Sequence, residues 1–324
     1  MPHWTGSIGR SPMVEPVALA ALALDAALGW PDRLYRRIGH PVGGFARLIA
    51  LCEDRWNRPI WGATHRRALG VLTVLLLFLL VGGSLVLIEA LCRTLFGRAA
   101  WIASALLAWP ALAQRSLFDH VRSVAQSLDT GDLTGARDAV GRIVGRDVQA
   151  LDETGVARAA IESLAESFCD GVVAPLFWLL VAGLPGLWIY KAVNTADSMI
   201  GHREERWRAF GWTAARLDDL LNLIPARLSG VLLCVVGGRG WRTLGRDHGR
   251  HASPNAGWPE AAMAGALDLR LAGPLRYDGQ LLDKPWIGDG RPEATAADIR
   301  RALSIYVRAC GLLWMIAGGW AWLR

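Results

Sequence analysis

The 324-residue sequence lacks the two commonest nucleotide-binding fingerprints. It contains no GxxxxGK(S/T) phosphate loop. Its nearest approach to GxGxxG fails, because Gly238-Arg239-Gly240 is followed by Thr243 where the third glycine would stand. In both fingerprints the glycines let the backbone come close to phosphate groups. A nucleotide, if the protein uses one, therefore binds without either of them.

Lysine and paired cysteines are also scarce. Lys191 and Lys284 are the only lysines, so arginine supplies almost all of the positive charge behind the net charge of +6. The five cysteines form no CxxC pair and lie far apart, which leaves no readable disulfide framework or zinc site. No zinc-finger or RNP-type motif is present, so we expect no nucleic-acid partner.

Apolar residues, in contrast, are abundant. The AVILMFWYC share is 52%, and the mean hydropathy is +0.26. Counting glycine and leaving out tyrosine gives about 62%, against roughly 45–50% in soluble domains. This composition excludes a disordered chain and argues against an ordinary soluble enzyme. We expect an all-α, multi-pass integral membrane protein with cytoplasmic helical loops and re-entrant segments, forming one membrane domain over residues 1–324.

Four segments are predicted to span the membrane. The clearest is 23 residues long with Glu89 as its only charge, and a helix of that length reaches roughly 34 Å. The first segment is interrupted by Glu15 and Asp25 and could be misread as a signal peptide. Its cleavage would export a following loop with eight arginines, against the positive-inside rule. The expected spans are 14–30, 69–91, 99–118 and 302–323.

Two further apolar segments, 172–190 and 226–237, leave the topology open. Pro175 and Leu184-Pro185-Gly186 break the first, and the second is short enough to be re-entrant or interfacial. If only one of them spanned, an arginine-rich loop would be exported. If both spanned, residues 191–225 alone would lie outside. We prefer the arrangement in which neither spans, so that every polar block faces the cytoplasm and both termini lie outside.

Acidic residues recur every four positions in 158–170. Glu162, Glu166 and Asp170 therefore line one helical stripe that runs into an apolar segment at the membrane surface. Carboxylates of this kind bind Mg²⁺ together with water and phosphate oxygens, but they also suit the solvated face of an amphipathic helix. Upstream, Gly145-Arg146-Asp147 suits either a turn that presents a guanidinium to phosphate or a plain surface turn.

Polar side chains are unusually dense in 191–227. So many short oxygen-bearing groups between apolar residues are costly near a bilayer unless they are paired or bind something. Helix capping can account for Asn194, Thr195 and Ser198 individually, but it does not account for five further polar residues together, so we favour a functional site. The members of the set are Asp197, Arg216, Asp218, Asp219 and Asn222.

The loop 248–258 carries weaker signals. His248 and His251 are three residues apart, and no third metal ligand is nearby in the sequence. The run Ser253-Pro254-Asn255-Ala256-Gly257 has the composition of an ordinary turn.

Taken in order, these blocks resemble the adenosylcobinamide-phosphate synthase family of cobalamin biosynthesis (the CbiB/CobD type). The resemblance covers most of the chain. Two positions depart from the family pattern: Ser167 stands where asparagine is expected, and Ala196 replaces a larger aliphatic residue. The matching blocks are Leu24-Asp25…Gly29-Trp30-Pro31, His40-Pro41-Val42, Gly145-Arg146-Asp147, Glu162-Ser163-Leu164-Ala165-Glu166, Asp170-Gly171-Val172-Val173-Ala174-Pro175, Asn194-Thr195-Ala196-Asp197-Ser198-Met199, Ala215-Arg216-Leu217-Asp218-Asp219 and His251-Ala252-Ser253-Pro254-Asn255-Ala256-Gly257.

The resemblance implies an inner-membrane enzyme whose active face is cytoplasmic. It joins adenosylcobyric acid to (R)-1-amino-2-propanol phosphate through an amide bond and needs ATP and Mg²⁺. Its expected partners are those substrates, the lipid bilayer and a downstream membrane cobalamin synthase. Because uncoupled amide formation is unfavourable in water, we expect an acyl phosphate intermediate, a chemistry that depends on charge neutralisation and positioning.

The roles implied by the resemblance fall into three groups. Asp197, Asp218 and His251 are expected to be catalytic, with His251 taking a proton from the incoming ammonium. Metal binding is expected from Glu162, Glu166, Asp170 and Asp219. Substrate or phosphate binding is expected from Arg146, Asn194, Arg216, Asn222, Arg227, Ser253 and Asn255.

A non-catalytic membrane protein, either a corrinoid carrier or a scaffold for a later enzyme of the pathway, is the alternative. A carrier places ionisable residues mid-span, often on broken helices. The predicted spans hold almost no charge, which favours catalysis at the surface. The broken segment 172–190 is the one feature that favours the carrier.

Overall fold

The computed structural model describes residues 14–145, 147–277, 280–282 and 284–322. The described chain is predominantly helical, as expected. Its helices are α1 (Val14–Leu28), α2 (Asp32–Ile38), α3 (Val42–Trp56), α4 (Ala63–Leu77), α5 (Gly83–Phe96), α6 (Ala100–Ala108), α7 (Gln114–Asp129), α8 (Leu133–Gly141), α9 (Glu153–Phe168), α10 (Ala174–Ile200), α11 (Glu205–Arg208), α12 (Trp212–Leu221), α13 (Leu223–Gly237), α14 (Trp241–Asp247), α15 (Gly257–Leu267) and α16 (Ala296–Trp322).

Two short antiparallel strand pairs interrupt the loop before α16, where only helices were expected. β1 (Leu271–Ala272) pairs with β4 (Trp286–Ile287), and β2 (Leu275–Tyr277) pairs with β3 (Gln280–Leu282). They contribute ten residues, so the fold class remains all-α.

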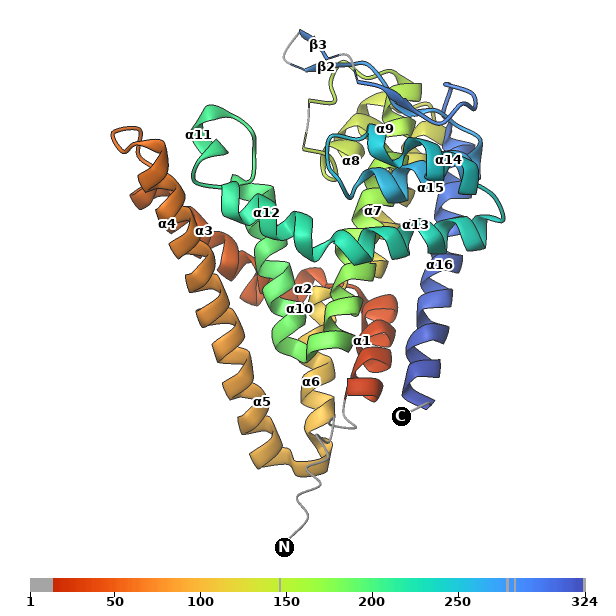
Figure 1. The fold of residues 1–324 in the computed structure, drawn as a ribbon. Helices are drawn as coiled ribbons and strands as arrows, with labels where there is room; N and C mark the ends of the chain where they lie inside the picture. Colours follow the sequence, from red (N-terminus) through yellow and green to blue (C-terminus); the bar gives the residue numbers. More distant parts are fainter. Residues whose placement is uncertain (1–13, 146, 278–279, 283, 323–324) are drawn as a thin grey trace, which may run out of the picture.

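The described chain has three helical stretches that are long and apolar enough to cross a membrane: Ala63–Asp129, Glu153–Ile200 and Ala296–Gly319. The bent pair α12 and α13 adds a fourth if it is counted as one span. The chain is therefore an all-α membrane protein. In Figure 1, α1, α5, α6 and the later part of α16 extend toward one end of the molecule, while α8, α9, α14 and α15 gather at the other.

The hairpin formed by α4–α5 and α6 carries much of the lipid-suited surface. Leu79, Leu87 and Leu95 are 69%, 71% and 64% exposed, an arrangement that suits hydrocarbon rather than water. The chain reverses at Gly97, whose φ of +52° is a conformation that glycine adopts without strain. The α-helix of the return limb ends at Ala108, and Pro110 lies in the 3-10 helical turn Trp109–Ala111 that follows before α7.

Helix α10 doubles back on itself, so the segment 172–190 does not run straight through the molecule. Gly183 has φ +65° and ψ −161°, a non-helical conformation two residues before Pro185. Asn194 then donates a hydrogen bond to Asp170, 24 residues earlier. A straight helix would hold those residues about 36 Å apart. The two limbs of α10 therefore form a hairpin whose ends return to the same end of the molecule.

The segment 226–237 lies in α13, which is bent by 46° from α12 and runs across the bundle in Figure 1. It packs against α15 and α16. The residues before and after α10 are therefore brought to one end of the fold. Both segments, 172–190 and 226–237, lie in helices apolar enough to be candidate spans, so the preference that neither spans stays a prediction. The assignment of membrane spans to 14–30, 69–91, 99–118 and 302–323 stays a prediction.

Helix α9 is the centre of the core. Its residues Val156, Ala160, Ile161 and Leu164 are fully buried, and the helix contacts α7, α8, α15 and α16. At its end the helix widens into the π-helical turn η4 (Cys169–Val173) before α10 begins. Such turns place side chains out of the regular helical register and are frequent at functional sites.

Candidate active site

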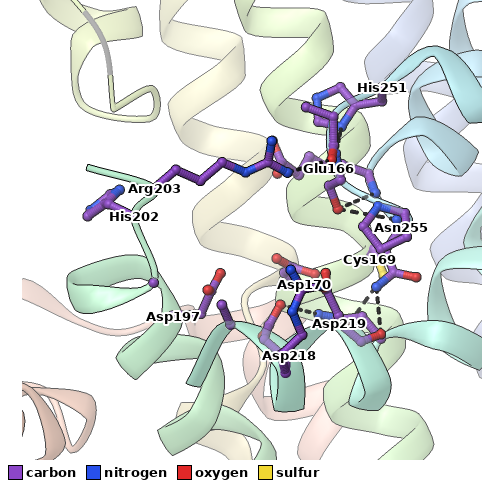
Figure 2. Close-up of a pocket in the computed structure, with 18 of the residues that line it drawn as sticks. Glu166, Cys169, Asp170, Asp197, His202, Arg203, Asp218, Asp219, His251 and Asn255 are labelled. Atoms are coloured by element: carbon purple, nitrogen blue, oxygen red, sulfur yellow. Dashed lines mark hydrogen bonds and ion pairs between the residues drawn. The ribbon is translucent and has the colours of Figure 1, made fainter. Parts of the chain in front are cut away.

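A cavity of about 680 Å³, here called the main cavity, opens at the end of the fold where these segments meet. Its walls come from the end of α9, the end of α10, the segment 201–208, α12 and the loop 251–256. Figure 2 shows their side chains converging on it. Its size lies within the usual range for a small-molecule site, roughly 300–1,000 Å³.

Four carboxylates face the main cavity and form what we call the acidic cluster: Glu166, Asp170, Asp197 and Asp218. Within the described residues, none of the four has an Arg, Lys or His nitrogen within ion-pair distance. Lys191 lies near Asp170 and Asp218 without forming an ion pair with either. Grouped carboxylates that form no ion pair repel one another unless a cation or protons neutralise them. The cluster is therefore an arrangement that a bound cation would stabilise.

Amide side chains hold the acidic cluster in place. Asn194 Nδ2 donates to Asp170 Oδ2 at 3.2 Å and to Asp218 Oδ1 at 3.1 Å, so one amide bridges two acids. Asn222 Nδ2 donates to the other oxygen of Asp218 at 3.0 Å. The Tyr190 hydroxyl in turn donates to Asn222 Oδ1 at 3.0 Å. These neutral donors orient the carboxylates without cancelling their charge.

Asp197 owes its position to the way α10 ends. The Gly201 N–H closes the helix on the Asp197 carbonyl at 2.7 Å. A Cβ atom at residue 201 would lie only 1.9 Å from Asp197 Oδ1, so glycine is required there. The Asp197 carboxylate can thus lie along the helix end and face the cavity.

The acidic cluster fits Mg²⁺ of the kind that a protein shares with phosphate. In the described chain, no three His, Cys, Asp or Glu side chains are close enough to form a cage for an ion by themselves. Mg²⁺ is commonly bound by one or two carboxylates while water and substrate phosphates complete its coordination. One or two carboxylates are therefore the most that the described chain offers to such an ion at one point.

Basic residues line the opposite part of the main cavity. His202, Arg203, Arg208 and Arg216 all face it, and Figure 2 shows Arg203 extending toward Glu166 and His251. Arg203 donates to the Ala252 carbonyl at 3.0 Å, which links the segment 201–208 to the loop 251–256. Arginine side chains of this kind suit phosphate and carboxylate ligands.

The segment 201–208 is held from outside the cavity by α3. Glu53 forms an ion pair with Arg206 at 2.9 Å and accepts a hydrogen bond from Trp207 Nε1 at 2.6 Å. Asn57 donates to the Arg206 carbonyl at 2.9 Å. Glu53 and Asn57, about 150 positions earlier in the chain, thus hold the segment 201–208, which forms the basic wall of the main cavity.

Hydrogen bonds within the loop 251–256 define its shape. His251 Nδ1 accepts from the Ser253 N–H at 3.0 Å, and Ser253 Oγ accepts from the Asn255 N–H at 3.2 Å. In the neutral ring the proton therefore lies on Nε2. Burial, and then the charge of Lys284, lower the pKa of His251 below its ordinary value. Proton uptake at Nδ1 would break the contact with Ser253.

Asn255 reaches from this loop to α12. Its Nδ2 donates to the Asp219 carbonyl at 2.7 Å, while its Oδ1 is buried and has no hydrogen-bond partner among the described residues. A buried carbonyl oxygen without a donor is unfavourable, so this atom is suited to accept from a ligand.

The structure brings most of the residues predicted from the sequence together. Asn194 lies beside the cavity and bridges two members of the acidic cluster. Asp219 differs from that cluster because Arg216 pairs with it at 3.0 Å. The predicted residues that line the main cavity are Glu166, Asp170, Asp197, Arg216, Asp218, Asp219, Asn222, His251, Ser253 and Asn255.

Besides Asn194, two predicted residues do not line the main cavity, and one lies outside the described residues. Glu162 accepts from the Ala272 N–H at 2.7 Å and lies 3.9 Å from Arg158, so it contacts β1 and its own helix. Arg227 stacks on Trp258, because the bend before α13 turns it away from α12. Arg146 lies outside the described residues.

His202, Arg203, Arg208 and Trp212 also line the main cavity and were not predicted. One signal in the sequence points to them: two basic residues follow Gly201 directly after the Asn194–Met199 block.

Comparison with known proteins gives a consistent result. The family model described as CobD/Cbib protein matches residues 18–306. The chain is 51% identical to the cobalamin biosynthesis protein CobD of Rhodobacter capsulatus, over 93% of this chain and 95% of that protein. It is 49% identical to the CobD of Sinorhizobium fredii, over 92% and 94%, and 45% identical to that of Rhizobium meliloti, also over 92% and 94%. No solved structure matches the chain.

Proposed function

We infer the function from the premise that this chain belongs to the CobD/Cbib protein family. Its relatives are named cobalamin biosynthesis proteins, and this chain takes part in the same biosynthesis as a membrane protein. We propose that it is a ligase that joins adenosylcobyric acid to (R)-1-amino-2-propanol phosphate, forming adenosylcobinamide phosphate with consumption of ATP.

The proposed reaction has two steps. The substrate carboxylate attacks the γ-phosphorus of ATP, giving an acyl phosphate and ADP. The amine nitrogen then attacks the acyl carbon, forming the amide bond, expelling phosphate and losing a proton. Both steps depend on bringing anionic groups together, so positioning and charge neutralisation supply most of the catalysis.

One observation carries the proposal: a single cavity combines an acidic cluster that forms no ion pair within the described residues with the arginines Arg203, Arg208 and Arg216. The acidic cluster is suited to hold Mg²⁺, which would neutralise phosphate charge when it is bound. Arg203, Arg208 and Arg216 are placed to bind phosphate or the substrate carboxylate. The unpartnered Asn255 Oδ1 is placed to accept a hydrogen bond from a substrate.

We further propose that the main cavity faces the cytoplasm at the inner membrane. The loops that join the predicted spans at this end of the molecule are rich in arginine, as the positive-inside rule requires. ATP is available on that side. The α10 hairpin supports this arrangement, because it returns residues 191–200 to the end where α9 finishes.

The test is reconstitution of the purified full-length chain in lipid nanodiscs with adenosylcobyric acid, the amine phosphate, ATP and Mg²⁺. We expect adenosylcobinamide phosphate by mass spectrometry and ADP in equal amount. Asp197→Asn should abolish both products. Asp129→Asn, which removes a carboxylate that pairs with Arg300 on the surface, should retain both.

Absence of product with a folded protein would contradict the proposal. The carrier alternative rests on the broken helix α10, which resembles the interrupted helices of transporters. It predicts corrinoid binding in the same nanodiscs without ADP release. The two functions are therefore separated by a single reaction mixture.

A further inference from the structure

A second cavity, of about 440 Å³, lies on the other side of η4 from the main cavity. It is lined by the end of α1, α2, the break at 110–113, α7 and Lys191 of α10. Asp25, Trp30 and His40 all line it. These three residues belong to the first two blocks of the family resemblance, and none of them reaches the main cavity. The second cavity thus accounts for blocks that the main cavity leaves without a role.

The charges of the second cavity are mixed. Lys191, His40 and His120 line it together with one carboxylate, Asp25. Asp25 accepts from the Gln114 N–H at 2.6 Å and from Gln114 Nε2 at 3.2 Å. Burial, and then the charge of Lys191, lower the pKa of His40, so the imidazole favours its neutral form. The Lys191 ammonium is therefore the group of this lining that an anion would approach.

Polar and aromatic groups complete the lining. The indole Nε1 of Trp30 is buried and has no hydrogen-bond partner within the described chain. Tyr35 lines the second cavity and is 58% exposed, so its side chain also reaches the surface. Aromatic rings of this kind attract cationic ligand groups through their faces. The cavity therefore offers sites for an anion and for a cation.

The wall between the two cavities is the π-helical turn η4. Lys191 Nζ donates to the Asp170 carbonyl at 3.4 Å, while the Asp170 side chain faces the main cavity. Ala113 N donates to the Gly171 carbonyl at 3.0 Å from the second cavity's side. A Cβ atom at residue 171 would lie 3.2 Å from Ala113 Cβ, so the contact is close. The turn η4 thus contacts the linings of both cavities.

We propose that the second cavity binds an aminoalcohol phosphate, the smaller of the two substrates in the proposed ligation, at a holding site separate from the main cavity where the amide bond forms. This inference rests on the proposed function for the identity of the substrate. Such an ester carries a phosphate that matches Lys191 and the histidines, and an ammonium that matches Asp25 and the aromatic rings. The main cavity suits it less, because the acidic cluster repels a phosphate that arrives without a metal ion.

The same chemistry occurs in two sources: the free phosphate ester and the headgroup of an ethanolamine phospholipid. The experiment separates them by measuring binding of (R)-1-amino-2-propanol phosphate to the full chain in nanodiscs of phosphatidylcholine alone, without ATP or corrinoid. We expect saturable binding that ethanolamine phosphate competes for. Aminopropanol without the phosphate should bind at least about tenfold more weakly, because it lacks the anion.

Binding measurements on substituted chains show which of the two cavities the ligand occupies. Lys191→Gln keeps a donor for the Asp170 carbonyl but removes the charge, and Trp30→Phe removes only the indole N–H. We expect each to weaken binding, the first by about tenfold or more. Arg122→Gln removes a charge from α7 outside the cavity lining and should bind normally. Thermal unfolding of each variant checks that it is folded.

Three results would overturn the inference. Binding lost in Asp197→Asn and kept in Lys191→Gln would place the ester in the main cavity. Binding that depends on none of the variants would exclude both cavities. Displacement of the free ester by phosphatidylethanolamine added to the nanodiscs would assign the cavity to a lipid headgroup. Failure of the ligation assay alongside binding that Lys191→Gln abolishes would reject the proposed reaction and leave the binding site standing.

Discussion

Two sets of carboxylates lie below the surface of this protein: Asp247 by itself, and the acidic cluster. They differ in their side-chain hydrogen-bonding partners, which are charged for Asp247 and neutral for the cluster. Asp247 is fully buried and is bound by Arg246 at 2.7 Å, by Arg250 at 3.2 Å and by the Gly288 N–H at 2.8 Å. The hydrogen bond from Arg246 is the main cause that holds the pKa of Asp247 below its ordinary value. The acidic cluster, in contrast, is oriented by neutral amide donors from Asn194 and Asn222.

The difference lies in what each set lacks. Asp247 and its arginines form a closed unit that ties α14 to the turn after β4, so a ligand has nothing to add. In the acidic cluster, hydrogen bonds orient Asp170 and Asp218, but no ion pair within the described residues neutralises the negative charges. Partner identity, rather than burial or residue type, therefore separates a structural carboxylate from one that awaits a ligand.

The largest expected effect concerns the acidic cluster. Asp218→Asn keeps the hydrogen-bonding shape beside Asn194 and Asn222 but removes one negative charge. We expect ligation activity to fall by about a thousandfold, equivalent to about 4 kcal/mol of transition-state stabilisation. Because like-charge repulsion is relieved, the melting temperature should stay equal or rise. Steady-state kinetics and thermal unfolding measured together would check this, and a large loss of stability would refute it.

The converse is expected at Asp247. Asp247→Asn leaves two arginines facing a site without its negative charge, and removing one partner of a buried ion pair costs about 3 kcal/mol of stability. Activity per folded molecule should change little, since Asp247 lies outside the main cavity lining. Denaturation monitored by tryptophan fluorescence measures the loss. Asp289→Asn is the matched control, because it removes the other, surface partner of Arg246.

The contrast between these two sets could be only partly read from the sequence. The spacing of Glu166 and Asp170 indicated a shared helical face, and both residues do line the main cavity. Glu162 belongs to the same spacing, yet it contacts β1 because α9 is buried and different elements cover its successive turns. Periodicity gives the face of a helix, and tertiary packing decides what each residue on that face contacts.

The fold, like the site, could be predicted from the sequence only in part. Composition alone predicted the apolar helices near 69–91 and 302–323, because a long uncharged run has few alternatives. Leu184-Pro185-Gly186 indicated a break in α10, but the return of its second limb depends on Gly183 and on the contacts of residues 190–194 with Asp170. The basic wall at 201–208 was missed because Glu53, far away in the sequence, fixes it.

A smaller effect is expected for His251, which lines the main cavity on the side of Glu166. If the acidic cluster were the counter-ion of His251, as Asp247 is of Arg246, the pKa of His251 would be raised. Burial instead lowers that pKa below 6.5. The neutral ring accepts from the Ser253 N–H, so this stabilisation is present above pH 6.5 and is lost as pH falls through the lowered pKa. We expect activity to fall by about tenfold between pH 6.5 and the lowered pKa of His251. The Ser253 N–H then loses the acceptor that helps to shape the loop 251–256.

His251→Asn tests this directly. The asparagine side-chain oxygen can accept from the N–H two residues ahead, as in an Asx turn, and it does not titrate. The acid limb of the pH–activity profile should therefore disappear in this variant. His65→Asn, on the exposed face of α4, should keep it. An unchanged acid limb in His251→Asn would assign the titration to another group.

The smallest effect is expected at Asp219, which tests where the boundary between the two sets lies. This residue lines the main cavity and was predicted to bind metal, yet its carboxylate is paired with Arg216 at 3.0 Å. Both side chains are partly exposed, at 27% and 61%, so the pair contributes about 0.5 kcal/mol or less. Asp219→Asn should lower activity only about threefold, because its backbone carbonyl still accepts from Asn255. A loss as large as that of Asp218→Asn would mean that a basic partner does not exempt a carboxylate from ligand binding, and the distinction between the two sets would fail.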